Sequence, residues 1–419
     1  MQLSALANRS RSSIDGREIH YVSLSFTAPD LESRRQRQAV NVGLVLDRSG
    51  SMAGRKLVLA RTAVDTGLSM LRAEDRFALV VFDDRIDLLA ASQHAHDDAR
   101  RKALQRLAHV EARGSTNLGE GWLRGASEIE PHRNPACLTR VIIATDGMAN
   151  HGEIDPERLI EWARMLHAKG ITTSTIGIGI DFQEDLLQGI SDAGGGHAYH
   201  AEKPEQLVDQ LASELGESVE VTLRQPVIDV TFPEGVSVEL LDAYPVTPRT
   251  GGLEVAPGDL TARQIVELMF EVTLPAGALG DSIALGFALR AGGGPGAIAH
   301  AETRWSFATP EAAASAPRIP EVEVRAAELI EARAREESLN LNRQGRYEDA
   351  EARFAAGARK LCALSAENAG VARVAQVMAG AGAALGAKMS AVDMKSQYRE
   401  FTLLRRGRAA DGKARQEPK

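Results

Sequence analysis

Short apolar runs alternate with longer amphipathic segments between about Val40 and Glu220, and this alternation restricts the fold more than any other feature of the chain. Each run is apolar on successive residues, as expected for strands that are buried on both faces. The runs are Val40–Leu46, Phe77–Phe82, Val141–Thr145 and Ile171–Ile178. The segments between them place apolar residues every three or four positions, which is typical of helices with one core-facing side. The pattern predicts an α/β domain with a doubly wound parallel sheet.

Oxygen-bearing side chains follow two of the predicted strands at the point where each strand ends. One segment, Asp47-Arg48-Ser49-Gly50-Ser51, comes directly after the first run, and another, Asp146-Gly147, comes directly after the third. A third segment, Gly114-Ser115-Thr116-Asn117, opens a helical stretch. In open α/β sheets, ligands bind outside the carboxyl ends of the strands. We therefore expect one site with three hydroxyls and two carboxylates, made of Asp47, Ser49, Ser51, Thr116 and Asp146.

The side chains expected at this site offer only oxygen, with no imidazole or thiolate among them. Hard cations such as Mg²⁺, Mn²⁺ and Ca²⁺ suit such a set, and zinc does not. The alternative is that the five residues only cap helices and turns, which Ser, Thr and Asp commonly do. We favour a metal site, with Mg²⁺ as the expected metal and Mn²⁺ or Ca²⁺ as its substitutes.

The same residues resemble those of a known family. The segments Asp47-Arg48-Ser49-Gly50-Ser51 and Asp146-Gly147, together with Thr116, match the pattern of the von Willebrand factor type A (VWA) domain. The likeness extends over roughly residues 40–215. Many stand-alone prokaryotic members of that family look like this chain. The resemblance implies a Rossmann-like VWA domain with a complete metal-ion-dependent adhesion site (MIDAS).

By that resemblance, the hydroxyls of Ser49, Ser51 and Thr116 would bind the metal directly or nearly so. The carboxylates of Asp47 and Asp146 would act mostly through metal-bound water. Mg²⁺ takes about six oxygen ligands and gives up water reluctantly. One position would then be left for an aspartate or glutamate of a partner protein, because the metal stays electrophilic when few protein anions touch it directly.

The resemblance therefore implies a divalent-metal-dependent protein-interaction module, acting as an intracellular adaptor rather than an enzyme. Two alternatives belong to other classes: a substrate-recruiting or regulatory partner of an AAA-type ATPase complex, and a cell-surface adhesin. The chain contains neither the Gly-x-Ser-x-Gly motif of hydrolases nor the full Gly-x-x-x-x-Gly-Lys-Ser/Thr motif of a phosphate loop. An ATPase would thus have to be a second protein, and an adhesin would need a secretion signal or an anchor.

Composition favours the cytoplasm and argues against nucleic acid. There are 49 Lys and Arg residues and 57 Asp and Glu residues, so the formal net charge is −8, which gives no electrostatic reason to expect DNA or RNA binding. The first residues lack the basic and apolar regions of a secretory signal. The most apolar stretch, Val374–Ala387, is shorter than the roughly 20 residues of a membrane span. The two cysteines, Cys137 and Cys362, indicate no disulfide framework.

The pattern changes after residue 220, where strand-sized segments with a period of two predict a β-sandwich. We expect an alternating N-terminal segment, Glu18–Phe26, to pair with this β region, which would make the α/β domain an insertion within the sandwich. The alternative is that the segment forms an edge strand of the α/β domain. Near the C-terminus, Gly345 separates two helical segments that resemble a tetratricopeptide-type (TPR-like) hairpin. The expected regions are N-terminal strands at 1–39, a VWA domain at 40–219, a β-sandwich at 220–309, a linker at 310–320, a TPR-like helical region at 321–404 and a basic tail at 405–419.

Overall fold

The chain forms two compact units. The first, called the α/β unit here, comprises Asp30–Thr222 and Gly258–Ala262; the second, the β/helical unit, comprises Met1–Pro29, Leu223–Pro257 and Arg263–Lys419. In sequence, the α/β unit is thus inserted into the β/helical unit. The computed structural model describes residues 1–30, 39–134, 137–179, 182–201, 205–219, 221–291, 294, 296–364, 368–390, 393–394, 397, 401, 404–407 and 415–416.

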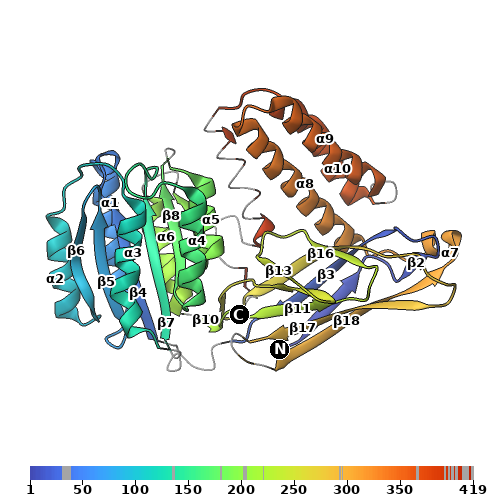
Figure 1. Ribbon diagram of the computed structural model, residues 1–419, viewed down its shortest axis with the longest axis horizontal. Helices are drawn as coiled ribbons and strands as arrows, with labels where there is room; N and C mark the ends of the chain where they lie inside the picture. Colours follow the sequence, from blue (N-terminus) through green and yellow to red (C-terminus); the bar gives the residue numbers. More distant parts are fainter. Residues whose placement is uncertain are drawn as a thin grey trace. The chain divides into compact units, whose positions relative to one another are not determined.

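A six-stranded sheet with the order β6-β5-β4-β7-β8-β9 forms the centre of the α/β unit (Figure 1). Every neighbouring pair is parallel except β5 and β6. The chain adds β5 and β6 on one side of β4 and then β7, β8 and β9 on the other, so the strand order reverses between β4 and β7. The strands are β4 (Ala39–Asp47), β5 (Arg76–Phe82), β6 (Ile86–His94), β7 (Cys137–Thr145), β8 (Thr172–Ile178) and β9 (Gly195–Ala201).

Helices cover both faces of this sheet, which confirms the predicted doubly wound α/β fold. Val42, Leu44 and Leu46 of β4 share one core with α1 (Arg55–Ser69), α2 (Asp97–Ala108) and α6 (Gln206–Val219). Val45 of the same strand belongs to the opposite core, with α3 (Leu118–Ile129), α4 (Pro156–Ala168) and α5 (Glu184–Ala193). Because Leu44, Val45 and Leu46 enter the two cores alternately, apolar side chains occupy successive positions in this part of β4.

Strand β6 departs from the parallel pattern and was not among the predicted strands. It runs antiparallel to β5, and the turn between them is closed by a hydrogen bond from the Asp83 amide to the Arg85 carbonyl (3.0 Å). Such a short connection leaves no room for the crossover that a parallel pair requires. As an edge strand, β6 is only partly buried, and its sequence mixes polar residues such as Asp87, Ser92 and Gln93 with apolar ones.

The β/helical unit contains a four-stranded sheet with the order β1-β3-β16-β12 and a six-stranded sheet with the order β13-β14-β11-β17-β18-β2. The rings of Phe270 in β16 and Phe287 in β17 lie 5.5 Å apart between their centroids, so side chains of the two sheets meet in a common core. This is the predicted β-sandwich. Its strands are β1 (Leu3–Ala7), β2 (Arg11–Ser13), β3 (Ile19–Thr27), β11 (Val227–Thr231), β12 (Ser237–Leu240), β13 (Val246–Arg249), β14 (Gly252–Val255), β16 (Ile265–Thr273), β17 (Ser282–Arg290) and β18 (Ala297–Ala308).

The N-terminal strand β3 pairs antiparallel with β16 along its whole length, from Ile19 opposite Thr273 to Thr27 opposite Ile265. The ends of the α/β unit's insertion are also tied together, because β10 (Val221–Leu223) and β15 (Leu260–Thr261) form a two-stranded sheet. Residues 310–320, expected as a linker, include the short helix α7 (Pro310–Ala314).

Three helices, α8 (Pro320–Arg343), α9 (Tyr347–Leu364) and α10 (Ala369–Leu385), form the C-terminal helical region. Gly345 adopts a φ of 75° between α8 and α9, a conformation that glycine allows at the end of a helix. The helices share an apolar core with Tyr21, Leu241 and Met269 of the β/helical unit. They therefore cover the face of the four-stranded sheet that points away from the sandwich core.

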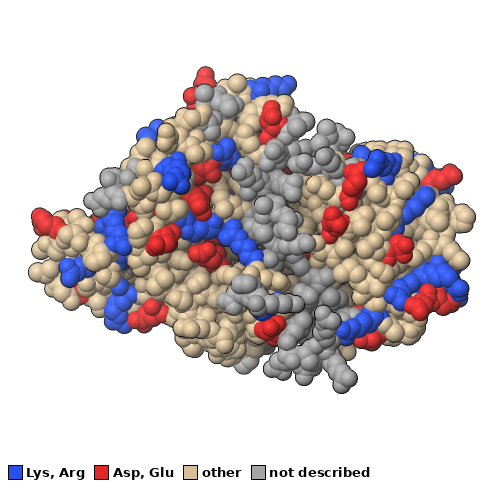
Figure 2. Space-filling view, turned by 180° about the vertical axis from the view of Figure 1, so that it is seen from behind, with Lys and Arg blue, Asp and Glu red and all other residues tan. Residues whose placement is uncertain are grey.

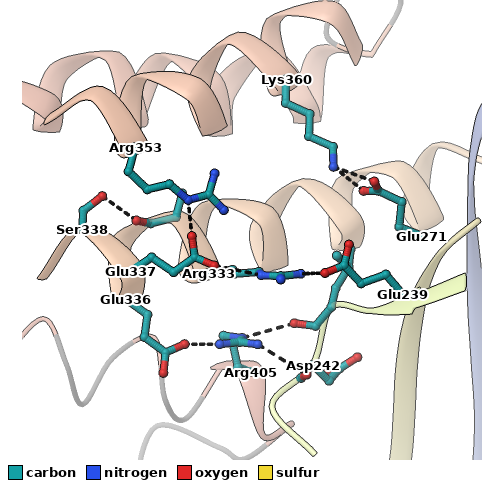
Figure 3. Close-up of polar contacts among 12 residues, drawn as sticks. Glu239, Asp242, Glu271, Arg333, Glu336, Glu337, Ser338, Arg353, Lys360 and Arg405 are labelled. Atoms are coloured by element: carbon teal, nitrogen blue, oxygen red, sulfur yellow. Dashed lines mark hydrogen bonds and ion pairs between the residues drawn. The ribbon is translucent and has the colours of Figure 1, made fainter. Parts of the chain in front are cut away.

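Ion pairs surround this apolar contact (Figure 3). Arg333 of α8 contacts Glu239 of β12 at 2.5 Å, and Lys360 of α9 contacts Glu271 of β16 at 2.5 Å. Arg405, at the start of the predicted basic tail, pairs with Glu336 of α8. Most of that tail, and part of the glycine-rich loop at 292–296, lie outside the described residues. Figure 2 shows Lys and Arg interspersed with Asp and Glu on the face drawn.

Candidate metal centre

The carboxyl ends of β4 and β7 lie side by side, because the two strands pair in parallel with Leu46 opposite Ala144. Asp47 is the last residue of β4, and Asp146 directly follows β7. After β4 the chain makes a short 3-10 turn, Gly50–Met52, and then enters α1. These loops stand where the strand order reverses, which is the usual place for ligands in open α/β sheets.

Four of the five predicted site residues form a continuous chain of polar contacts. The Asp47 carboxylate accepts hydrogen bonds from the Ser49 amide (2.7 Å) and from the Thr145 hydroxyl. The hydroxyls of Ser49 and Ser51 lie 3.1 Å apart, and the Ser51 hydroxyl donates to Oδ1 of Asp146 at 2.7 Å. The two carboxylates are thus linked through the two serines.

Thr116 reaches the same place from a different loop. Its amide donates to the Asn150 side-chain oxygen (2.7 Å), and the Asn150 amide donates back to the Thr116 carbonyl (3.1 Å). A Cβ placed on Gly147 would lie 2.9 Å from the Thr116 hydroxyl oxygen and 3.8 Å from Oδ2 of Asp47. The Thr116 hydroxyl therefore faces the carboxylates across Gly147, and the structure brings all five residues together.

Ion pairs behind the site fix the loops that carry these residues. The Arg48 guanidinium contacts Asp83 (3.2 Å) and Asp87 (2.5 Å), and Arg113 contacts Asp83 at 2.7 Å. The Arg113 amide also donates to the Arg48 carbonyl (2.9 Å). Burial opposes ionisation of Asp83, but hydrogen bonds from Arg113 and the Arg85 amide, together with the Arg48 charge, lower the pKa of this carboxyl below its usual range. The loop after β4 is thereby joined to the loop that precedes Thr116.

Lys56 also belongs to the site, and the motif did not identify it. Its ammonium forms an ion pair with Oδ2 of Asp146. Lys56 stands in the first turn of α1, where the helix dipole favours negative rather than positive side chains. A cation in that position, soon after a motif rich in acidic and hydroxyl groups, is the signal in the sequence that could have found it.

The residues present fit a hard divalent cation. Two carboxylates and three hydroxyls supply oxygen alone, which suits Mg²⁺, Mn²⁺ or Ca²⁺. Among the described residues, no group of three or more His, Cys, Asp or Glu side chains is placed to hold a metal, so a metal here would depend on the hydroxyls. Burial raises the pKa of Asp47 to about 6, against hydrogen bonds from Thr145 and Ser49 that lower it. A nearby cation would favour the ionised form of this carboxyl.

The sequence profile of the von Willebrand factor type A domain matches residues 41–213. These residues form a VWA domain. The match begins within β4 and ends within α6, and so includes every element that carries a residue of the candidate metal centre. VWA domains are in general protein-interaction modules.

Solved structures share the fold over more than the VWA domain. A von Willebrand factor type A protein from Catenulispora acidiphila has a TM-score of 0.67 at 20% identity, with 85% of each chain covered. The ArnB paralog VWA2 from Sulfolobus acidocaldarius has a TM-score of 0.57 at 13% identity and covers 96% of this chain and 97% of its own. At these identities the likeness concerns the fold alone.

A curated relative, the uncharacterized protein YfbK of Escherichia coli, is 28% identical over 253 residues, which are 56% of this chain and 42% of that protein. The chain spans less than half the length of the first curated relatives that it matches. In the part of the chain that the structure describes, no helix combines the length and the apolar character needed to cross a membrane.

Proposed function

We propose that the VWA domain binds a divalent cation, normally Mg²⁺, at a complete MIDAS, and that this site holds an aspartate or glutamate of a partner protein. One observation carries the proposal: side chains from three loops converge at the carboxyl edge of the sheet and present only oxygen. The side chains are Asp47, Ser49, Ser51, Thr116 and Asp146.

The burial of these residues supports binding from one side. Asp47, Thr116 and Asp146 are at most 2% exposed, so they form a floor that solvent does not reach freely. Ser51 is exposed, so the site has an accessible side next to the Ser51 hydroxyl. When bound, the cation supplies a Lewis-acidic position for a carboxylate oxygen. The role of the five residues is to hold that cation while leaving this side open to a partner.

The proposed role is that of a non-enzymatic, intracellular adaptor of the stand-alone prokaryotic type. The alternatives are a partner of an AAA-type ATPase complex and a cell-surface adhesin. The same site would serve in each case, and the proteins that it retains distinguish between them. An ATPase among these proteins would identify the first alternative.

Affinity capture with the full chain tests the proposal. The chain is immobilised and exposed to lysate in Mg²⁺ and again in chelator, and the retained proteins are identified by mass spectrometry. Asp47→Ala removes one carboxylate of the site. Asp97→Ala serves as a matched control, because Asp97 lies on α2 with a side chain that is 96% exposed. Circular dichroism establishes that both variants are folded.

A partner retained by the wild type and by Asp97→Ala in Mg²⁺, but lost in chelator and with Asp47→Ala, is the expected result. The acidic residue that such a partner presents can then be found by substituting its Asp and Glu residues. Retention of the same proteins by the wild type in Mg²⁺, by the wild type in chelator and by both variants in Mg²⁺ would refute metal-dependent binding.

A further inference from the structure

Lys56 shares a carboxylate with the metal centre. Its ammonium pairs with Oδ2 of Asp146, while Oδ1 of the same carboxylate accepts the Ser51 hydroxyl at 2.7 Å. The Asp146 side chain is 0% exposed and the Lys56 side chain is 23% exposed. A Cβ placed on Gly179 would lie 3.7 Å from the Lys56 ammonium, so the end of this side chain is held between the loops that follow β7 and β8.

The other cations near the site are engaged by acids of their own. Arg48 and Arg113 both contact Asp83 and Asp87, behind the loop that follows β4. These ion pairs balance the charges of both arginines, so neither arginine adds a net positive charge to the metal centre. Lys56 differs from them because the carboxylate that it contacts is one of the five site residues.

The charges of the site determine what Lys56 does. Asp47, Asp146 and Lys56 sum to −1, so a divalent cation would bring the site to +1 and a partner's carboxylate would then bring it to zero. If Lys56 were neutral, the cation alone would bring the site to zero, and the same carboxylate would leave it at −1. Charges separated by a few ångströms in a partly buried site interact strongly.

We propose that Lys56 couples the binding of the metal to the binding of the partner. Its positive charge weakens divalent-cation binding to the free protein, and a carboxylate from the partner restores it by supplying the balancing negative charge. Coupling of this kind is reciprocal, so the metal strengthens partner binding by the same factor. This inference rests on the proposed function, because it assumes that a divalent cation and a carboxylate meet at this site.

Titration of Mn²⁺ into the full chain, with free Mn²⁺ measured by electron paramagnetic resonance, tests the inference. Lys56→Met removes the charge and keeps most of the side-chain length, and Lys56→Arg keeps the charge. Arg55→Met is the matched control: it removes a positive charge from the adjacent position, where the side chain is 75% exposed and pairs with Glu205. Asp47→Asn removes the charge of one site carboxylate and shows whether Mn²⁺ binds at this site.

We expect Lys56→Met to bind Mn²⁺ about tenfold more tightly than the wild type. Lys56→Arg and Arg55→Met should stay near the wild type, and Asp47→Asn should lose binding. Sodium acetate, compared with sodium chloride at equal ionic strength and corrected for acetate complexes of Mn²⁺, should tighten Mn²⁺ binding to the wild type more than to Lys56→Met. If Lys56 only helped to start helix α1, Lys56→Met would change the melting temperature, and acetate would have the same effect on the variant as on the wild type.

The Mn²⁺ titrations distinguish a failure of the inference about Lys56 from a failure of the proposed function. If the wild type binds Mn²⁺ through Asp47 and Lys56→Met binds no more tightly, the inference about Lys56 is wrong and the proposed function stands. If none of the five proteins binds Mn²⁺, both the proposed function and the inference are wrong.

Discussion

At the scale of single residues, the candidate metal centre depends on small side chains as much as on charged ones. Gly147 separates the Thr116 hydroxyl from the Asp47 carboxylate, and a Cβ there would approach the hydroxyl oxygen to 2.9 Å. At Gly50, in the loop after β4, a Cβ would come no closer than 3.6 Å to its nearest neighbour, the Gly114 carbonyl oxygen. The two glycines of the motif therefore tolerate a methyl group to different degrees.

Gly147→Ala should therefore displace the Thr116 hydroxyl and weaken Mn²⁺ binding by about tenfold, which is roughly 1.4 kcal/mol. Gly50→Ala is the matched control and should leave the affinity within about twofold of the wild type. Isothermal titration calorimetry with Mn²⁺ measures both. Equal affinities for the two variants would show that Thr116 does not bind the metal.

His20 is a residue of the β/helical unit whose protonation should control stability. Its ring is 0% exposed and lies 5.4 Å from the Trp305 ring between centroids. Neither ring nitrogen has a hydrogen-bond partner among the described residues, and a carboxylate oxygen of Glu18 lies 3.7 Å from Nε2. Burial, together with the charge of Arg9, lowers the pKa of His20 to about 3. The folded state therefore keeps this ring neutral at pH values where the unfolded chain protonates it.

The sign of the pH dependence follows from these values. Between pH 6.5 and about 3 the unfolded state binds the extra proton, so the contribution of His20 is fully present above pH 6.5 and is lost as the pH falls. By pH 5 the loss should reach roughly 2 kcal/mol. His20→Phe should remove this part of the acid destabilisation, as scanning calorimetry at pH 7, 6 and 5 would show. An identical fall in melting temperature for wild type and variant would contradict the assignment.

At the scale of helices and strands, a buried ion-pair network ties α6 to the sheet. Arg140 of β7 contacts Glu214 of α6 and also Asp259, at 3.4 Å, in the segment that returns to this unit. Glu214 accepts further hydrogen bonds from Ser174 (2.6 Å) and His197 (3.1 Å). Burial opposes ionisation of Glu214, but the charges of Arg140 and His197 hold its pKa well below the usual range.

Glu214→Gln should destabilise the α/β unit by about 2–4 kcal/mol, because removing one partner leaves buried charge uncompensated. Glu161→Gln on α4 is the control: its carboxylate is 58% exposed and pairs with Arg164 at the surface, where such pairs contribute about 0–1 kcal/mol. Scanning calorimetry of the full chain measures both. A loss of stability as small for Glu214→Gln as for Glu161→Gln would show that the network contributes little.

The elements that could be predicted from the sequence are those whose pattern is local. Four parallel strands were visible as runs rich in apolar and β-branched residues, since both faces of each strand are buried. Edge strand β6 was missed because its partial burial removes that signal. The grouping of Asp47 with Asp146 followed from the rule for strand ends, whereas the contact of Lys56 with Asp146 joins residues 90 positions apart. Such a contact depends on the direction of α1 relative to the loop that precedes it, and no short sequence pattern determines that direction.

At the scale of the whole molecule, the chain builds two units that each have a core. Strand β3 precedes the α/β unit in the sequence, and its pairing partner β16 follows that unit. Nothing local in Glu18–Phe26 distinguishes this partner from an edge of the α/β sheet, so the sequence left both arrangements open. The N-terminal strands and the C-terminal helices belong to the same unit. The VWA domain is thus an insertion in the sequence, and its candidate metal centre consists of its own residues.

Metal binding by the VWA domain can be tested in crystals of the full chain grown with Mn²⁺. The measurement is an anomalous difference map recorded at a wavelength where manganese scatters anomalously. We expect a peak at the carboxyl edge of the VWA sheet, about 2.0–2.6 Å from the hydroxyl oxygens of Ser49, Ser51 and Thr116. The peak should be absent from crystals of Asp47→Ala. A well-ordered site without such a peak in saturating Mn²⁺, or a peak bound only by other residues, would contradict this expectation.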